Sequence, residues 1–210
     1  VFFPMAGAIL TYLIGRRNKT ARDYAADCIV IVEFAAMLFV FCMYYMSWEL
    51  MKNPANSFGY PSSCTIPGFC GMGLHFTLDG FRALYGGIAT FMWMMSTVFS
   101  KEYFAHYRNR NRYYFFLLLT LGATMGVFLS ADLYTLFIFF EMMSFTSYVW
   151  VAHDEKKESL RAAETYLAVA VAGGLVMLMG LLLLYHEVGT LDIDGLYERC
   201  GLIMLGKGTE

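Results

Sequence analysis

Six stretches of the sequence consist almost entirely of apolar side chains, and they restrict the chain to few kinds of fold. At 1.5 Å per residue, a helix needs about 20 residues to cross about 30 Å of hydrocarbon. The last five stretches are close to that length, so we expect each of them to form a transmembrane helix. The six stretches are residues 1–14, 24–48, 81–99, 113–130, 133–152 and 162–185.

Two alternative architectures are excluded by the composition of these stretches. Strands of a membrane barrel alternate apolar and polar residues over about ten positions, whereas these stretches are apolar on every side. A soluble protein with buried helices would need enough polar surface to enclose them, and 210 residues with 15% charged side chains cannot supply it. The sequence therefore predicts an all-α polytopic membrane protein with about six transmembrane helices.

The first stretch differs from the others because it has only 14 residues and starts at Val1. A secretory signal would carry positive charge before its apolar segment, whereas here Arg16, Arg17 and Lys19 follow it. We therefore interpret residues 1–14 as part of a membrane helix that begins before Val1.

The positive charges between the stretches predict the orientation of the chain. Segments 15–23, 101–112 and 153–161 carry eleven of the 15 Lys and Arg residues, and the connections on the opposite side carry four. Because Lys and Arg are enriched in cytoplasmic loops, this alternation predicts six spans in the cell membrane with both chain ends outside.

Two connections have distinct expected structures. Residues 49–79 form the longest connection, contain Pro and Gly without clear periodicity, and are expected to cap the outer face. Within this loop Cys64 and Cys70 bracket a Pro-Gly turn, so they could form a disulfide in an oxidising compartment or remain free thiols. Between the fourth and fifth stretches only Ala131 and Asp132 remain clearly outside the helices, which predicts a tight antiparallel hairpin.

Glu141 is the main anomaly of the sequence, because it lies in the apolar segment LFIFFEMMSF near the middle of a predicted membrane helix. An acidic side chain at this depth costs about 2.5–3.5 kcal/mol on insertion scales. Tyr134, Ser144 and Tyr148 are spaced from Glu141 by seven, three and seven residues, so they share one helix face with it. We expect this polar face to turn inward.

Two roles are open to a carboxyl group in this position. Desolvation favours its neutral form and a nearby cation favours its ionised form, so alternating between these environments would move a proton. In the other role, a protonated glutamate forms a static hydrogen bond to a neighbouring helix. Ser144 and Tyr148 are candidate hydrogen-bond supports in either case.

Other charged residues within or beside the apolar stretches have less specific interpretations. Glu33 lies well inside the second stretch, where it could extend a proton path or form a local hydrogen bond as a neutral carboxyl. Two pairs are spaced three residues apart, as salt bridges within a helix require. These pairs are Asp79 with Arg82 and Arg161 with Glu164.

Several classes of function find no support in the sequence. The 15 Lys and Arg residues nearly balance 17 Asp and Glu residues, so the chain lacks the basic excess of a nucleic-acid-binding protein. The four histidines are dispersed and the cysteines have no metal-ligand spacing, so we predict neither a metal site nor a haem or other cofactor. GLIMLGKG at 201–208 falls short of a phosphate-binding loop because glycine occupies the Ser/Thr position.

The segment from Tyr113 to Ile193 resembles the antiporter-like proton-translocating family shared by respiratory complex I, Mrp-type sodium/proton antiporters and membrane-bound hydrogenases. The resemblance depends on FLSADLYTLFIFFEMMSFTSY, on RAAETYLAVAVAGGLVMLMGLLLLY and on VGTLDI. DGFRALY at 79–85 is similar to the start of the family's third helix.

The resemblance implies a role for Glu141. In the family, a glutamate in helix five works with a lysine in a broken helix seven, and two inverted five-helix repeats form the proton path. Glu141 occupies the position of that glutamate, whereas the lysine would lie beyond residue 210. Many members also carry a lysine immediately before the tyrosine of helix six, where this chain has Thr165 before Tyr166.

By this resemblance the chain is the N-terminal portion of an antiporter-like fold. Residues 1–112 would contain helices 1–3 with the outer loop 49–79, and residues 113–210 would contain helices 4–6 as the incomplete start of the first repeat. The implied function is proton translocation within a larger complex that couples redox energy to ion transport. The redox centres would then belong to partner membrane subunits, with lipid around the assembly.

Two alternatives stay open at this point. One is an Mrp-type sodium/proton antiporter subunit, for which sodium would be a second transported ion. The other is a truncated membrane scaffold without conduction, which the lack of an intramembrane lysine in these 210 residues would favour.

Overall fold

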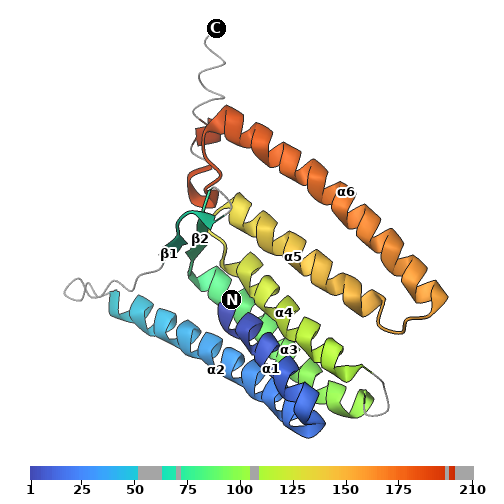
Figure 1. Ribbon diagram of the computed structural model, residues 1–210. Coiled ribbons are helices and arrows are strands. Elements are labelled where there is room, and N and C mark those ends of the chain that lie inside the picture. The colour runs from blue at the N-terminus through green and yellow to red at the C-terminus, as the bar shows by residue number, and fades with distance from the viewer. Residues whose placement is uncertain (52–62, 70–71, 105–108, 197–198, 202–210) are drawn as a thin grey trace.

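A computed structural model describes residues 1–51, 63–69, 72–104, 109–196 and 199–201. It contains six long helices and one two-stranded antiparallel sheet within these ranges (Figure 1). The elements are α1 (Phe2–Arg17), α2 (Lys19–Met51), β1 (Ser63–Ile66), β2 (Leu74–Thr77), α3 (Gly80–Tyr103), α4 (Arg110–Leu129), α5 (Leu133–Val151) and α6 (Lys157–Val188).

The helices match the six predicted apolar stretches in order and position. Among the described residues, four are long and apolar enough to cross a membrane: Lys19–Met46 of α2, and helices α4, α5 and α6. The expected six spans are thus an approximate number. The other two helices differ from these four: α1 has only 16 residues, and the sequence of α3 contains Gly, Ser and Thr between its apolar residues.

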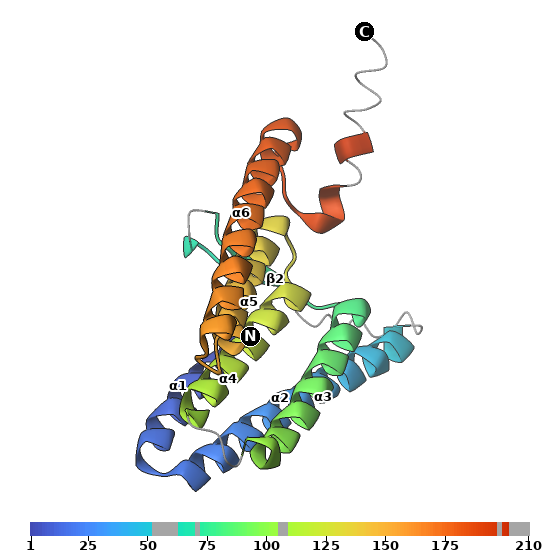
Figure 2. The same cartoon turned by 90° about the vertical axis from the view of Figure 1, so that its right-hand side faces the viewer.

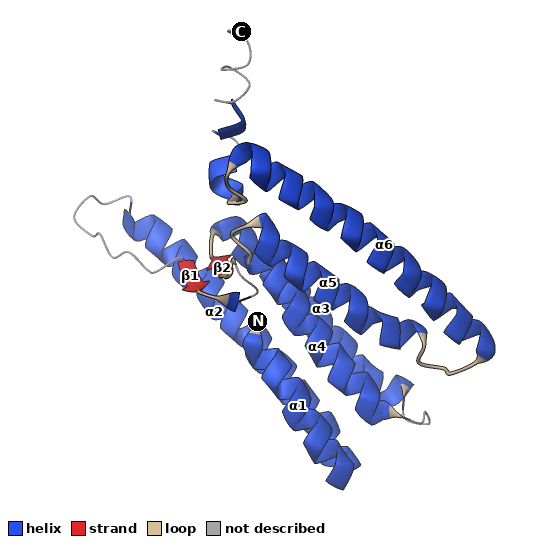
Figure 3. Ribbon diagram, turned by 45° about the horizontal axis from the view of Figure 1, so that its top comes forward, coloured by secondary structure: helices blue, strands red, loops and turns tan. Residues whose placement is uncertain are grey.

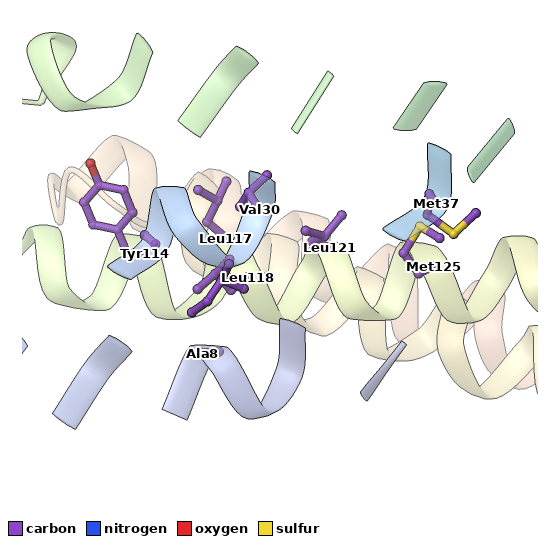
Figure 4. Packing of buried hydrophobic residues seen from close by; sticks show 10 residues of the cluster. Ala8, Val30, Met37, Tyr114, Leu117, Leu118, Leu121 and Met125 are labelled. Atoms are coloured by element: carbon purple, nitrogen blue, oxygen red, sulfur yellow. The ribbon is translucent and has the colours of Figure 1, made fainter. Parts of the chain in front are cut away.

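Helix α4 is the centre of the bundle. It contacts α1, α2, α3 and α5, while α6 packs along the opposite side of α5 (Figures 1 and 2). The core forms where apolar side chains of α4 meet Ala8 of α1 and Val30 and Met37 of α2 (Figure 4). The contributing residues of α4 are Tyr114, Leu117, Leu118, Leu121 and Met125.

Small residues allow α4 to approach its neighbours closely, as is common where membrane helices pack. Gly122 lies against Met5 of α1, and Gly126 lies against the ring of Phe139 on α5. A side chain at either position would overlap these neighbours.

Ion pairs connect the helix ends where the predicted cytoplasmic segments lie. The guanidinium of Arg110 on α4 donates to Asp23 of α2 at 2.9 Å, and Arg112 pairs with Glu155 after α5 at 2.6 Å. Lys101 at the end of α3 pairs with Asp27 of α2. The three Lys- and Arg-rich segments are therefore held together at one end of the bundle.

The opposite end carries the sheet (Figure 3), a feature that the sequence did not predict. Residues 63–66 and 74–77 pair in antiparallel register, from Ser63 with Thr77 to Ile66 with Leu74. They confirm an ordered structure for part of the loop 49–79. Residues 52–62 and Cys70 lie outside the described residues, and the proposed disulfide with them, while Cys64 is a free, exposed thiol.

The hairpin between α4 and α5 is confirmed. Helix α4 ends at Leu129, α5 begins at Leu133, and the carboxylate of Asp132 caps α5 by accepting from the amide of Thr135. Asp79 caps α3 in the same way and also pairs with Arg82, as predicted.

Candidate ion-translocation site

Glu141 lies between α5 and α6 and is partly buried. A Cβ atom added to Gly174 of α6 would lie 2.5 Å from Oε1 of Glu141 and 2.7 Å from its carboxyl carbon. The absence of a side chain at position 174 is thus what allows the carboxyl group to rest on the backbone of α6. No hydrogen bond or ion pair to Glu141 is present within the described part of the chain.

The polar face that contains Glu141 turns toward α6, which makes the expectation of an inward-facing stripe more specific. The buried residues of α5 are Thr135, Phe139 and Thr146, and they lie on the side packed against α4. Glu141 lies on the opposite side, so the stripe faces α6 and not the α1–α4 core.

Ser144 and Tyr148, the predicted supports, lie on α5 and are half-buried. The hydroxyl of Ser144 donates to the carbonyl of Phe140 in its own helix at 3.1 Å. No hydrogen bond joins Ser144 or Tyr148 to Glu141 in the ranges that the structure covers. A supporting role for either residue remains a prediction that depends on movement of these side chains.

A pair of threonines on the other side of α5 was not singled out from the sequence. The hydroxyl of Thr120 on α4 donates to Thr146 on α5 at 2.8 Å, and Thr124 of α4 lies 3.6 Å from the sulfur of Met143. The Thr124 hydroxyl donates to the carbonyl of Thr120, and the single proton of the Thr120 hydroxyl is shared between Thr146 and the carbonyl of Phe116 at 2.7 Å. The α4–α5 interface thus combines a hydrogen bond between two threonines with the apolar contact of Gly126 and Phe139.

Glu33 lies on the far side of α4 from Glu141. Glu33 belongs to α2 and is only 7% exposed, and it lies beside Val1, the residue before α1. Helices α1 and α5 both contact α4, which lies between them. The structure thus separates the two membrane carboxyl groups, and a path that includes Glu33 would have to pass α4.

Arg161 and Glu164 are exposed residues near the start of α6, and no salt bridge joins them among the described residues. Thr165, at the position where the resemblance suggests lysine, donates to the carbonyl of Arg161 at 3.0 Å. The described residues also contain no group of three His, Cys, Asp or Glu side chains that could hold a metal ion. Of the segment GLIMLGKG at 201–208, residues 202–208 lie outside the described residues.

The segments at the sheet end surround a cavity of about 360 Å³. The turn after α4 is held on one side by β2 and on the other by residues 191–193. Ala131 donates to the carbonyl of His75 at 2.8 Å, and Leu133 donates to that of Leu191 at 3.0 Å. Gly189, with φ of 75°, ends α6 and turns the chain back toward this site.

Comparisons with known proteins agree with this architecture. Residues 130–207 match the model of the NADH:quinone oxidoreductase/Mrp antiporter transmembrane family. A Na(+)/H(+) antiporter subunit from Alkalihalophilus pseudofirmus is 30% identical over 199 residues, which are 93% of this chain and 24% of that protein. A Na(+)/H(+) antiporter subunit from Staphylococcus saprophyticus is 28% identical over 174 residues, covering 82% of this chain and 21% of that one.

Solved structures show the same fold. The membrane-bound sulfane sulfur reductase, an archaeal respiratory membrane complex, superposes with a TM-score of 0.75 at 18% identity, covering 97% of this chain and 39% of that one. The Mrp complex from Dietzia sp. DQ12-45-1b gives 0.70 at 18% identity, covering 92% and 20%. The chain thus spans about a quarter of the length of the antiporter proteins it matches.

Proposed function

Because residues 130–207 place this integral membrane chain in the NADH:quinone oxidoreductase/Mrp antiporter family, we propose that it translocates protons as part of a larger membrane complex. Glu141 would be the proton-carrying group. The observation that carries the proposal is the position of its carboxyl group in the α5–α6 interface, against Gly174 and without a fixed partner among the described residues.

A carboxyl group in this position suits proton transfer better than static support. A structural carboxyl would offset its desolvation with a lasting hydrogen bond, as the Thr120–Thr146 pair does on the other side of α5. An unpaired carboxyl responds instead to any cation that approaches, because its protonation then depends on that charge. In the proposal this cation comes from the remainder of the complex.

The electron carriers of a redox-driven complex would belong to other subunits. Residues 113–210 would supply the first part of the ion path, and residues 1–112 would pack against it. The Lys- and Arg-rich end of the bundle would face the cytoplasm, with both chain ends outside. A membrane-impermeant thiol reagent should then label Cys64 from outside and a K156C variant from inside.

The second candidate is sodium/proton antiport, which the names of the related antiporter proteins favour. It uses the same carboxyl group and differs in the ion that is exchanged. Proton movement that requires added sodium would identify this candidate, whereas movement driven by a redox substrate without sodium would favour the respiratory type.

Glu141→Gln tests the shared proposal. The full-length subunit would be expressed with its complex in everted membrane vesicles, and proton movement followed with a pH-sensitive dye. Glutamine keeps the size and polarity of the side chain but cannot bind and release a proton, so we expect at least a tenfold lower rate. Glu164→Gln, at an exposed position of α6, is the matched control and should retain the rate. An unchanged rate for E141Q would reject the proposal and favour a scaffold.

A further inference from the structure

The cavity at the sheet end of the bundle brings together five ionisable groups that are far apart in the sequence. Their side chains line one space open to solvent, at the end of the α5–α6 interface. These groups are His75 of β2, Asp132 before α5, Tyr134 of α5, Tyr185 of α6 and Asp192 in the segment after α6.

The central contact of the cavity is between His75 and Asp132. The imidazole Nε2 lies 3.8 Å from Oδ2 of Asp132, and the two side chains are 40% and 12% exposed, respectively. Nδ1 of the same ring is 3.2 Å from the hydroxyl of Thr65. The backbone of His75 is held as well, because its amide donates to Thr135 of α5 at 3.0 Å. A solvent-accessible group is thus fixed beside a nearly buried one.

The cavity is aligned with Glu141. Tyr134 is two helical turns from Glu141 on the same face of α5, and Tyr185 is about three turns from Gly174 on α6. Both tyrosines line the cavity. Glu141 is nine positions after Asp132, a rise of about 13 Å along α5. The cavity therefore opens at the end of the interface in which the Glu141 carboxyl lies.

We propose that this cavity is the outer proton-exchange vestibule of the Glu141 site, with His75 and Asp132 as its transfer pair. In the tautomer whose Nδ1–H donates to the Thr65 hydroxyl, Nε2 carries no proton, and a proton that reaches the Asp132 carboxylate from the α5–α6 interface crosses the 3.8 Å to Nε2 of His75. The new Nε2–H then faces the carbonyl of Met72, 3.4 Å away. The imidazolium then releases this proton to water outside, and both groups return to their starting states. Imidazole suits this step because one of its ring nitrogens accepts a proton and can release the proton again to water. The inference rests on the proposed function of Glu141.

The test uses the full-length subunit in its complex, in right-side-out vesicles with the outer pH varied from 5.5 to 8.5. His75→Gln should lower the maximal rate of proton release about tenfold and weaken the dependence of that rate on outer pH. Asp132→Asn should have the same effect, and because asparagine is also a good N-cap, α5 should remain intact. His186→Gln is the matched control, since this exposed histidine at the end of α6 lies outside the cavity lining.

Chemical rescue separates proton transfer from a structural role. In a His75→Ala variant, imidazole added outside the vesicles should restore a measurable part of the rate, because it can occupy the space and carry the proton. Wild-type rates and pH profiles for both H75Q and D132N would overturn the vestibule. If E141Q abolishes transport while these variants do not, only the vestibule fails; if E141Q is active, the proposed function fails as well.

Discussion

Helix α5 carries polar side chains on two sides, and these side chains differ in whether they have a hydrogen-bond partner. Toward α4, the hydroxyls of Thr120 and Thr146 are paired and buried. Toward α6, Glu141 rests on a glycine and has no hydrogen-bond or ion-pair partner within the described ranges. The first arrangement stabilises one packing of two helices. The second leaves a titratable group able to exchange its partner, which is what ion translocation requires.

A glycine allows close contact on each side of α5, Gly126 toward α4 and Gly174 toward α6. Substitution of the two glycines should have different effects. Gly126→Ala would force a methyl group into the ring of Phe139 at the α4–α5 contact. Overpacking of this kind costs about 2 kcal/mol, which would appear as a lower unfolding midpoint of the purified subunit in detergent. Gly87→Ala on α3 is the control, because an added Cβ there meets nothing within 4 Å. Equal midpoints for G126A and G87A would contradict a closed α4–α5 contact.

Gly174→Ala should affect transport more than stability. The methyl group would displace the Glu141 carboxyl, whose side chain can move away from the 2.5 Å contact at little cost to packing. We expect about a tenfold lower proton-translocation rate, equivalent to about 1.4 kcal/mol, with a nearly unchanged unfolding midpoint. Gly173→Ala, one residue earlier with open space around it, should leave both quantities unchanged. A G174A variant that transports at the wild-type rate would remove the functional contrast between the two glycines.

Much of the fold could be predicted because the membrane imposes length and hydropathy on each helix. The positions of all six helices and the turn at Asp132 follow from apolar stretches and a capping residue. The sheet could not be predicted, because two strands of four residues in a loop rich in Gly and Pro show no clear alternation of apolar and polar residues. Their position depends on pairing with the α4–α5 turn, which lies more than fifty residues away in sequence.

For the candidate site, the sequence predicts the residues that share a helix face but not the helix that packs on that face. Helical spacing places Glu141, Ser144 and Tyr148 on one face, but it does not tell which helix covers that face. The cover is Gly174, 33 positions later, and nothing in the local sequence marks it as different from Gly173. The ion pair of Arg110 with Asp23 is equally non-local, since 87 positions separate the two residues.

The threonine pair gives a smaller effect that sharpens the same comparison. Thr146→Val keeps the shape of the side chain and removes the acceptor of the Thr120 hydroxyl. Hydrogen bonds between membrane helices are worth about 0.6 kcal/mol on average, so we expect a slightly lower unfolding midpoint and an unchanged transport rate. Ser147→Ala removes only a bond to the carbonyl of Met143 in the same helix and serves as the control. Loss of transport in T146V would mean that the α4 side also carries ions.

The smallest effect concerns His153, which lies outside the membrane helices beside the aromatic rings of Phe104 and Tyr113. Burial and the neighbouring Arg112 lower the pKa of His153. Below about pH 6.5 the unfolded chain therefore binds a proton that the folded chain does not, and stability falls as the pH is lowered. His153→Gln should make the unfolding midpoint less dependent on pH between 7.5 and 5.5. If the unfolding midpoints of H153Q and the wild type change with pH in parallel, the pH dependence of stability does not come from His153.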